Sequence, residues 1–225
     1  MTEADLTIID YGLNNLKSVS KGFEKIGRSS KVVDTPEEVL SAKCLVLPGI
    51  GAFEDGMNGL KKRGLIDPIK QKVSEGTPFL GICLGMQMLF TESEEFGLHK
   101  GLDLIKGRVI AFKPPEEMNI DWYKVPHMGW NEIITPAGST WNGSFLEETK
   151  EETNVYFVHS FYPVPEDKGV ILATTEHGKQ IFASVVQKGS LVGTQFHPEK
   201  SGELGLSLLE SFCDINNIGK GGAEK

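Results

Sequence analysis

Short apolar runs alternate with amphipathic stretches through the first hundred residues. The run from Leu6 to Asp10 predicts a strand, and apolar positions then recur at helical spacing from Leu16 to Ile26, where Gly27 ends the helix. The same alternation continues, with strands expected at 31–33, 44–48 and 77–82 and helices after Pro36 and at 54–63, 66–75 and 84–91. This order is typical of a parallel sheet with helices on both faces, which binds ligands at the carboxyl ends of its strands.

The pattern changes after about residue 100. Extended segments separated by Gly, Pro and Asn turns are expected at 104–112, 155–158, 170–175, 181–187 and 191–196, and a helix at 203–215. We therefore predict an α/β fold with a doubly wound, mostly parallel central sheet and antiparallel additions. No linker divides the chain, so we expect one domain over 1–217 and a flexible tail over 218–225.

Composition and charge exclude several classes of function. The chain has 31 acidic and 23 basic residues and a net charge of -8, which argues against a broad nucleic-acid or anionic membrane surface. The longest apolar run, from Pro78 to Phe90, is shorter than the ~20 residues that a bilayer requires. The N-terminus lacks the basic and apolar regions of a secretory signal, so a cytoplasmic location is expected.

Three cysteines stand at positions 44, 83 and 213. Their spacing matches no disulfide framework and no metal or redox pair, so we expect free thiols and neither a metal nor a cofactor. Cys83 lies within Gly81-Ile82-Cys83-Leu84-Gly85, at a predicted transition from strand to helix. This is the thiol form of a nucleophile elbow, in which the N–H of Leu84 would donate to an oxyanion and the helix would favour a thiolate. From the pentapeptide alone, an inert core cysteine is equally compatible.

A thiol nucleophile requires a base, and five histidines are present. His197 ends a predicted strand, and Pro198 biases it toward an extended backbone in which Glu199 faces the same way and can orient the imidazole. A strand-end histidine with a solvated glutamate is the alternative. His159 also ends a strand without a following carboxylate, so we place it on the substrate side.

The segment Pro48-Gly49-Ile50-Gly51-Ala52-Phe53 is a glycine-rich loop directly after the third predicted strand. It lacks the Lys-Ser/Thr of a phosphate-binding loop and the dinucleotide fingerprint. Beside a nucleophile elbow, the loop is expected to supply the second oxyanion donor, and a plain turn is the alternative.

Together, PGIGAF, GICLGMQ and QFHPEKSG resemble the class I, or triad, glutamine amidotransferases, whose fold is flavodoxin-like. The segments PHMGWN at 126–131 and YFVHSFY at 156–162 narrow the resemblance to the HisH-type glutaminase subunits of imidazole glycerol phosphate synthase. The resemblance covers nearly the whole chain.

This resemblance implies hydrolysis of L-glutamine to glutamate and ammonia. The ammonia would pass to a (β/α)8 cyclase of the HisF type, in a heterodimer that makes imidazole glycerol phosphate and AICAR in histidine biosynthesis. Carried over by motif position, the catalytic residues are Cys83, His197 and Glu199. The oxyanion hole falls on Leu84, Ile50 and Gly51, the substrate site on Gly51, Gln87, Glu95, His159, Ser160 and Phe161, and the partner interface on Met128, Trp130, Tyr156 and Lys200.

The loop Gly49 to Gly51 is expected to reorient before it can donate an N–H, which would make turnover depend on the partner. Asn14 and Phe161 depart from common residues of the family, and the stretch from Lys113 to Lys124 has no assigned role. Three other functions remain open at this point: a HisH-like paralogue that serves another synthase, for instance in modified-sugar biosynthesis, a free-standing thiol hydrolase such as a γ-glutamyl hydrolase, and a scaffold that has kept only the fold.

Overall fold

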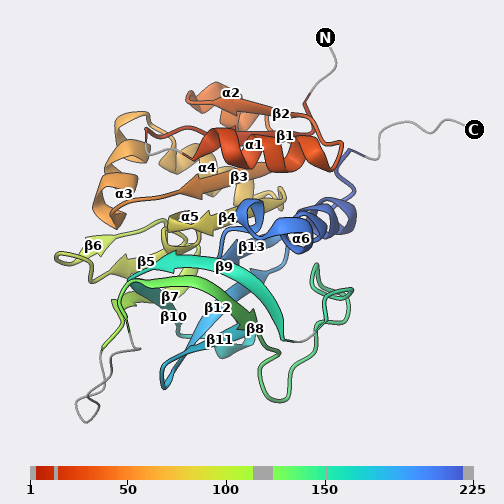
Figure 1. Cartoon of the computed structure of the whole chain (residues 1–225). Helices are drawn as coiled ribbons and strands as arrows, with labels where there is room; N and C mark the ends of the chain where they lie inside the picture. The colour runs from red at the N-terminus through yellow and green to blue at the C-terminus, as the bar shows by residue number, and fades with distance from the viewer. Residues whose placement is uncertain (1–3, 13–14, 114–123, 151, 220–225) are drawn as a thin grey trace, which may run out of the picture.

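The computed structural model describes residues 4–12, 15–113, 124–150 and 152–219. A seven-stranded sheet runs through the molecule in the order β11-β12-β13-β4-β3-β1-β2 (Figure 1). The strands from β13 to β2 are parallel, and β12 and β11 extend the sheet in antiparallel fashion. These strands are β1 (Leu6–Ile9), β2 (Ser30–Val33), β3 (Leu45–Gly49), β4 (Phe79–Cys83), β13 (Leu191–Thr194), β12 (Gln180–Lys188) and β11 (Ile171–His177). The predicted α/β fold with a mostly parallel sheet and antiparallel additions is confirmed.

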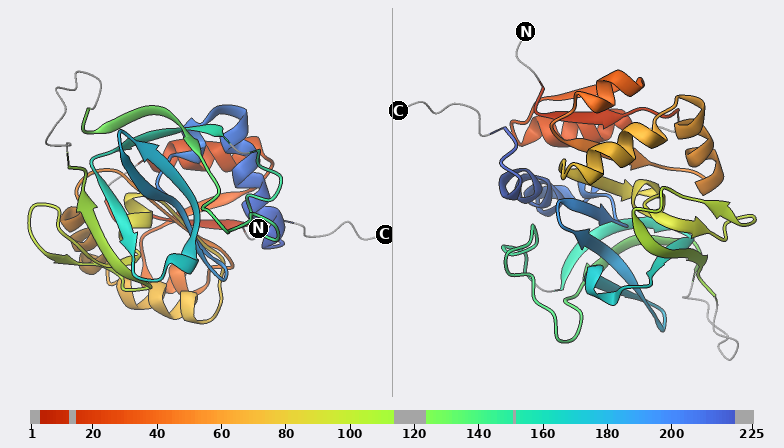
Figure 2. Two further views of the ribbon diagram at one scale, coloured as in Figure 1. Left: turned by 90° about the horizontal axis from the view of Figure 1, so that it is seen from below. Right: turned by 180° about the vertical axis from the view of Figure 1, so that it is seen from behind.

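Helices cover both faces of this sheet (Figures 1 and 2). Side chains of successive residues in one strand point alternately to the two faces of the sheet. Ile8 belongs to the core beneath α1 and α6, and Ile9 belongs to the core beneath α2, α3 and α4. A sheet covered on both faces has strands that are apolar throughout, as predicted. The helices are α1 (Leu16–Lys25), α2 (Pro36–Leu40), α3 (Phe53–Lys62), α4 (Ile66–Ser74), α5 (Leu84–Gln87) and α6 (Gly202–Ile215).

Two smaller sheets and two 3-10 helices, η1 (Lys168–Val170) and η2 (Pro198–Lys200), are the other regular elements of the described residues. One sheet has the order β10-β7-β5-β6, and the other sheet is the antiparallel pair β8-β9. The long strands β8 and β9 form an arch, and β9 passes over the carboxyl ends of β4 and β13 (Figure 1). The strands are β5 (Phe90–Ser93), β6 (His99–Lys100), β7 (Ile105–Ala111), β8 (His127–Ile133), β9 (Thr153–His159) and β10 (Phe161–Pro165). The arch closes the region where the parallel strands end.

Two local expectations were wrong. The helix expected over 84–91 ends at Gln87, because the chain from Phe90 pairs with β7 and leaves helical geometry. The strands β5, β6, β8 and β10 were not expected as separate elements. In β8, Gly129 has φ of +133° and polar residues are interspersed, which hides the alternation of a strand.

The packed part of the chain extends beyond the expected boundary at residue 217. Ile218 is buried, and its N–H donates to the carbonyl of Cys213 at 2.8 Å. The Gly219 carbonyl accepts a hydrogen bond from Arg28 at 3.1 Å. The expected tail therefore begins after Gly219 at the earliest, and residues 220–225 lie outside the described residues, as do Asn14 and most of the 113–124 stretch.

Candidate active site

Cys83 is the last residue of β4 and directly precedes α5, as the elbow motif predicts. Its backbone has φ of +54°, a left-handed conformation that is costly for a residue other than glycine. The bend is possible because of the neighbouring glycines. A Cβ at Gly85 would collide with the carbonyl of Leu47, and one at Gly81 would lie 2.9 Å from backbone atoms of Gly85 and Met86. The packing of β3, β4 and α5 thus fixes the position of the thiol.

Helix α5 is a single turn of four residues. The macrodipole of this short helix is therefore much smaller than the macrodipole of the eight-residue helix that the sequence predicted. Leu84 begins this turn, and the first N–H groups of a helix have no intrahelical acceptor, so the N–H of Leu84 is suited to a donor role.

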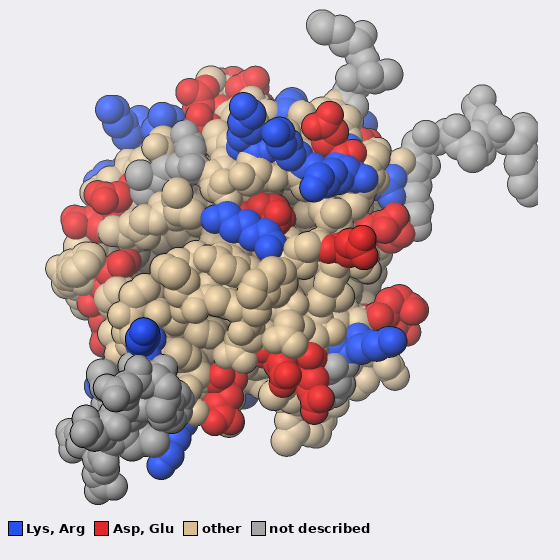
Figure 3. All heavy atoms as spheres, viewed as in Figure 1, with Lys and Arg blue, Asp and Glu red and all other residues tan. Residues whose placement is uncertain are grey.

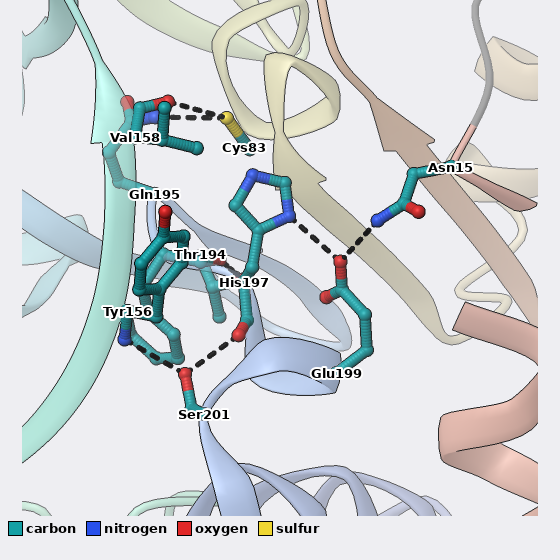
Figure 4. A network of polar contacts seen from close by, with 10 residues as sticks. Asn15, Cys83, Tyr156, Val158, Thr194, Gln195, His197, Glu199 and Ser201 are labelled. Carbon is teal, nitrogen blue, oxygen red and sulfur yellow. Dashed lines mark hydrogen bonds and ion pairs between the residues drawn. The ribbon is translucent and has the colours of Figure 1, made fainter. Parts of the chain in front are cut away.

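His197 and Glu199 follow β13 and meet Cys83 from the neighbouring strand (Figure 4). Glu199 accepts a hydrogen bond from His197 Nδ1 at 2.8 Å, and the imidazole stands between Cys83 and Glu199. The opposite ring nitrogen, Nε2, is buried and has no hydrogen bond within the described part of the chain. Asn15, at the start of α1, donates to the same Glu199 oxygen at 2.8 Å. His197 itself has the expected extended backbone, but Glu199 lies in a short 3-10 helix, Pro198–Lys200. This turn, and not the expected extended segment, brings the Glu199 carboxylate to the ring.

The imidazole is held in a charged environment. Burial alone would lower the pKa of His197, but the negative charges of a Cys83 thiolate and of Glu199 outweigh it and raise the pKa to about 10. The protonated ring is accordingly favoured at neutral pH. A thiolate beside an imidazolium is the form in which cysteine acts as a nucleophile.

The backbone around His197 is tied to β9. The N–H of His197 donates to the carbonyl of Tyr156 at 2.9 Å. Ser201 Oγ donates to the His197 carbonyl at 2.7 Å and accepts from the N–H of Tyr156 at 3.0 Å (Figure 4). The arch and the segment that carries the histidine therefore hold one another in position.

Cys83 opens into a pocket of about 340 Å³. Nine residues that the sequence placed in the oxyanion hole, the substrate site or the nucleophile position line it, together with Phe96, Pro126 and Val158. The nine are Ile50, Gly51, Cys83, Leu84, Gln87, Glu95, His159, Ser160 and Phe161. His197 and Glu199 stand behind the thiol and do not line the pocket.

Two polar side chains of the pocket are fixed by hydrogen bonds. Gln87 Nε2 donates to the carbonyl of Phe161 at 2.8 Å and to Gln195 Oε1 at 3.1 Å, so both of its amide hydrogens are used and its oxygen is left for a ligand. Glu95 accepts from the N–H of Phe53, at the start of α3, at 2.7 Å. Burial raises the pKa of Glu95 above its ordinary value.

The glycine-rich loop closes the pocket on the side of β3. Gly51 has φ of +103°, and Ile50 is exposed. The base of the loop is anchored by a residue that the sequence did not single out. Buried Tyr11 donates its hydroxyl to the carbonyl of Pro48 at 2.8 Å, and a Cβ at Gly49 would collide with that hydroxyl.

The four residues expected at a partner interface lie close to one another on or beside the arch. Trp130 and Tyr156 are paired across β8 and β9, with ring centroids 6.2 Å apart. Met128 is 63% exposed and Trp130 is 57% exposed, and Lys200 is also exposed. Figure 3 shows a broad area without charged side chains on this face, below the charged side chains around α1. The wide apolar exposure of Met128 and Trp130 is typical of a protein interface.

The other two cysteines are buried in the hydrophobic core. Burial raises the pKa of Cys44 well above its ordinary value and that of Cys213 to about 12. All three cysteines are free thiols. Among the described residues, no helix has the length and apolar character needed to cross a membrane.

The profile of the family "Glutamine amidotransferase class-I" matches residues 7–215. The chain belongs to this family. This class-I glutamine amidotransferase is 50% identical to the imidazole glycerol phosphate synthase subunit HisH of Syntrophotalea carbinolica over 211 residues, which are 93% of the chain and 100% of that relative. It is 47% identical to the HisH subunit of Geobacter metallireducens, over 93% of the chain and 98% of the relative. It is 48% identical to the HisH subunit of a Geobacillus species, over 92% of the chain and 95% of the relative.

Solved structures share the fold at low identity. A crystal structure of a glutamine amidotransferase covers 94% of this chain and 99% of its own, with a TM-score of 0.70 and 17% identity. The glutaminase domain of Trypanosoma brucei CTPS with bound acivicin covers 95% and 94%, with a TM-score of 0.60 and 13% identity. These likenesses confirm the fold class, and the family is established by the profile and the HisH relatives.

Several residues of this class-I glutamine amidotransferase site were missed in the sequence. Asn15, which holds Glu199, comes from the first loop, and Gln195 donates to Cys83 Sγ at 3.7 Å. Ser201 and Tyr11 were also missed. Gln195 and Ser201 both lie within the motif QFHPEKSG, and Gln195 stands two positions before His197, directly after β13.

Proposed function

We propose that this class-I glutamine amidotransferase hydrolyses L-glutamine to L-glutamate and ammonia through a γ-glutamyl thioester on Cys83. One observation carries the proposal: a strained cysteine at the tip of β4 lies beside an imidazole that Glu199 binds and charges, at the edge of a pocket of about 340 Å³. The near-complete alignment with HisH subunits supports the same conclusion.

The chemistry proceeds in two halves. The Cys83 thiolate attacks the carbon of the side-chain amide, and the C–N bond breaks as His197 gives its proton to the departing ammonia. His197 then takes a proton from water, whose oxygen attacks the thioester, and the thiolate leaves as the sulfur–carbon bond breaks. Glu199 stabilises the charged imidazole and keeps the proton on Nδ1, so that Nε2 faces the reacting atoms.

The pocket offers complementary groups for the amino-acid end of glutamine. Gln87 retains its amide oxygen as an acceptor, and Glu95 supplies a carboxylate, so both suit the α-ammonium group. The backbone of 159–161 and the edge of Gly51 also line the pocket and would hold the α-carboxylate. An ammonium beside Glu95 would restore the ionised carboxyl that burial disfavours.

The N–H of Leu84 and an N–H of the Gly49 to Gly51 loop would form the oxyanion hole. The base of the loop is fixed by Tyr11, and its tip is exposed at Ile50, so reorientation is confined to the peptides after Pro48. Glycine at both positions keeps the rotation of these peptides inexpensive. The isolated chain would therefore turn over slowly and the assembled enzyme quickly.

The partner would be a HisF-type (β/α)8 cyclase that covers Met128, Trp130, Tyr156 and Lys200. HisH relatives are named as synthase subunits, and the paired rings of Trp130 and Tyr156 provide an aromatic centre of the kind that interfaces favour. Ammonia would pass beside these rings to the cyclase, which makes imidazole glycerol phosphate and AICAR in histidine biosynthesis. Free thiols in all three cysteines suit the cytoplasm.

The test is a glutaminase assay of the wild type and of Cys83→Ala, each with and without a HisF-type cyclase and its ribonucleotide ligand. Wild-type turnover should rise strongly with the loaded partner, and Cys83→Ala should be inactive in every condition. Cys44→Ala serves as the matched control because it removes a thiol far from the pocket. Turnover by Cys83→Ala would overturn the thioester, and equal wild-type rates with and without partner would overturn the gating.

A further inference from the structure

His127 and His159 face one another across β8 and β9. They are register partners in the antiparallel pair, and His127 Nδ1 lies 3.0 Å from His159 Nε2. Both side chains are almost completely buried. Neither is used by the chemistry proposed above, although His159 lines the pocket.

Only one arrangement of protons satisfies this pair. His159 Nδ1 lies 2.9 Å from the carbonyl of Phe161, which can only accept, so His159 Nδ1 carries a hydrogen. In a neutral ring, His159 Nε2 is then an acceptor, and the hydrogen between the two rings belongs to His127 Nδ1. His127 Nε2 must in turn accept, and Asn131 Nδ2 supplies the donor at 3.1 Å.

The amide of Asn131 is itself held in this orientation. Its Nδ2 donates a second hydrogen to the carbonyl of Glu176 at 2.8 Å, and its oxygen accepts from the N–H of Glu132 at 2.8 Å. The direction of every bond from Asn131 through His127 to His159 is therefore determined by groups whose donor or acceptor character cannot change. Burial lowers the pKa of His127 to about 4 and that of His159 to about 3, so both rings are neutral at physiological pH.

The same series of bonds continues into the pocket. The Phe161 carbonyl that accepts from His159 also accepts from Gln87, and Gln87 donates to Gln195. Gln195 in turn donates to Cys83 Sγ at 3.7 Å (Figure 4). An unbroken path of donors and acceptors thus links β8 to the pocket wall and the nucleophile.

We propose that His127 is a positioning residue for glutamine binding: as the neutral Nδ1–H tautomer, it holds the His159 ring and, through the Phe161 carbonyl, the orientation of the Gln87 amide. This inference rests on the proposed glutaminase function, because it assigns Gln87 Oε1 and the 159–161 backbone to the bound substrate. His127 touches neither substrate nor thiol, and its effect falls on substrate binding. Replacing it should raise KM far more than it lowers kcat.

The test uses the complex with the cyclase and its ligand. His127→Phe keeps an aromatic ring against Phe157 but cannot donate to His159, and we expect KM for glutamine to rise about tenfold with kcat changed by less than about threefold. His127→Asn, whose amide nitrogen lies near the position of Nδ1, should restore most of the affinity. Phe157→Leu is the packing control, since it removes the ring stacked on His127 and no polar group, and it should lower the melting temperature with KM close to wild type.

A second measurement does not depend on whether these variants fold. Imidazole nitrogen-15 spectra of the wild-type complex at pH 7 should show both His127 and His159 as Nδ1–H tautomers. An Nε2–H tautomer or a charged ring at either position overturns the proposal, as does an unchanged KM in His127→Phe. Failure of the glutaminase function itself would show as a wild-type complex without turnover, which is a separate result.

Discussion

Two groups of buried histidines near one pocket are driven to opposite protonation states. His197, beside the nucleophile, has its pKa raised to about 10, whereas His127 and His159, paired across β8 and β9, have theirs lowered to about 4 and 3. Burial disfavours the charged form of each of the three rings. The difference lies in the partners: His197 meets Cys83 and Glu199. His127 and His159 meet a carbonyl, an amide, each other and the ring of His177, which stacks on His127 and also disfavours charge on both.

The comparison shows that one fold can hold a reactive imidazole and structural imidazoles close to one another. A carboxylate fixed behind His197 makes the ring an acid and base. Neutral donors and acceptors around His127 and His159 keep those rings uncharged and fix the direction of their hydrogen bonds. Replacing the groups that contact a ring should therefore change the pKa and the protonation state of that ring in a predictable direction.

The largest effect should come from removing the charge behind His197. In Glu199→Gln, the neutral amide no longer stabilises the imidazolium, and kcat for glutamine should fall by about 10²- to 10⁴-fold, the range typical of general acid–base catalysis. The measurement is steady-state turnover in the complex. Glu203→Gln, an exposed residue in the first turn of α6, is the matched control and should retain full activity. Comparable losses in both variants would contradict a specific role for Glu199.

A smaller effect is expected when the neutral rings are forced to charge. Because the pKa values of His127 and His159 are lowered below the ordinary value of 6.5, the unfolded chain binds more protons than the folded one in acid. Stability should be complete above about pH 6.5 and decline as the pH falls toward 4 and then 3, by on the order of a few kcal/mol. Urea unfolding of the wild type and of His127→Phe between pH 7 and pH 4 gives the free energy of unfolding at each pH. An equal decline in the variant would remove His127 from the explanation.

The charge of the thiolate can be separated from that of Glu199 by removing the sulfur. In Cys83→Ala, burial is no longer opposed by a thiolate, so the pKa of His197 should fall from about 10 toward its ordinary value. A nuclear magnetic resonance titration of the His197 ring between pH 6 and pH 10.5 gives the result. Titration at the same pH in the wild type and the variant would show that Cys83 does not charge the ring.

The smallest effect is expected from the residue that supports Glu199. Asn15→Ala removes one hydrogen bond to the carboxylate, worth about 1 kcal/mol, while His197 keeps its own bond. Turnover should fall about fivefold, since 1.4 kcal/mol corresponds to a factor of ten. Asn15→Asp should be worse than Asn15→Ala, because a second carboxylate would repel Glu199. Full activity in Asn15→Asp would show that Asn15 does not act through Glu199.

Much of this architecture could be predicted because the decisive signals are local. Apolar strands and helices of period 3.6 define the parallel sheet, and a glycine on each side of Cys83 marks the elbow. The two-residue spacing of His197 and Glu199 predicts that the two side chains meet, although the backbone at Glu199 forms a 3-10 turn in place of the expected extended segment. These features depend on neighbours in the sequence, and the structure shows them where they were expected.

The remainder depends on contacts between distant segments. Asn15 reaches Glu199 across 184 positions, and Gln195 reaches Cys83 across 112, which no spacing rule foretells. The helix over 84–91 was wrong for the same reason, because the partner strand β7 lies beyond it in the chain. The pairing of His127 with His159 requires the β8–β9 register, and β8 itself gave no recognisable alternation.

The two buried cysteines have a practical consequence for measuring the enzyme. Cys44 and Cys213 are fully covered, and burial raises the pKa of both, so in the folded protein a thiol reagent meets only Cys83. The number of rapidly reacting thiols per chain thereby counts competent active centres, and the number after denaturation counts all chains at three thiols each. The ratio of these two titrations gives the working fraction of any preparation.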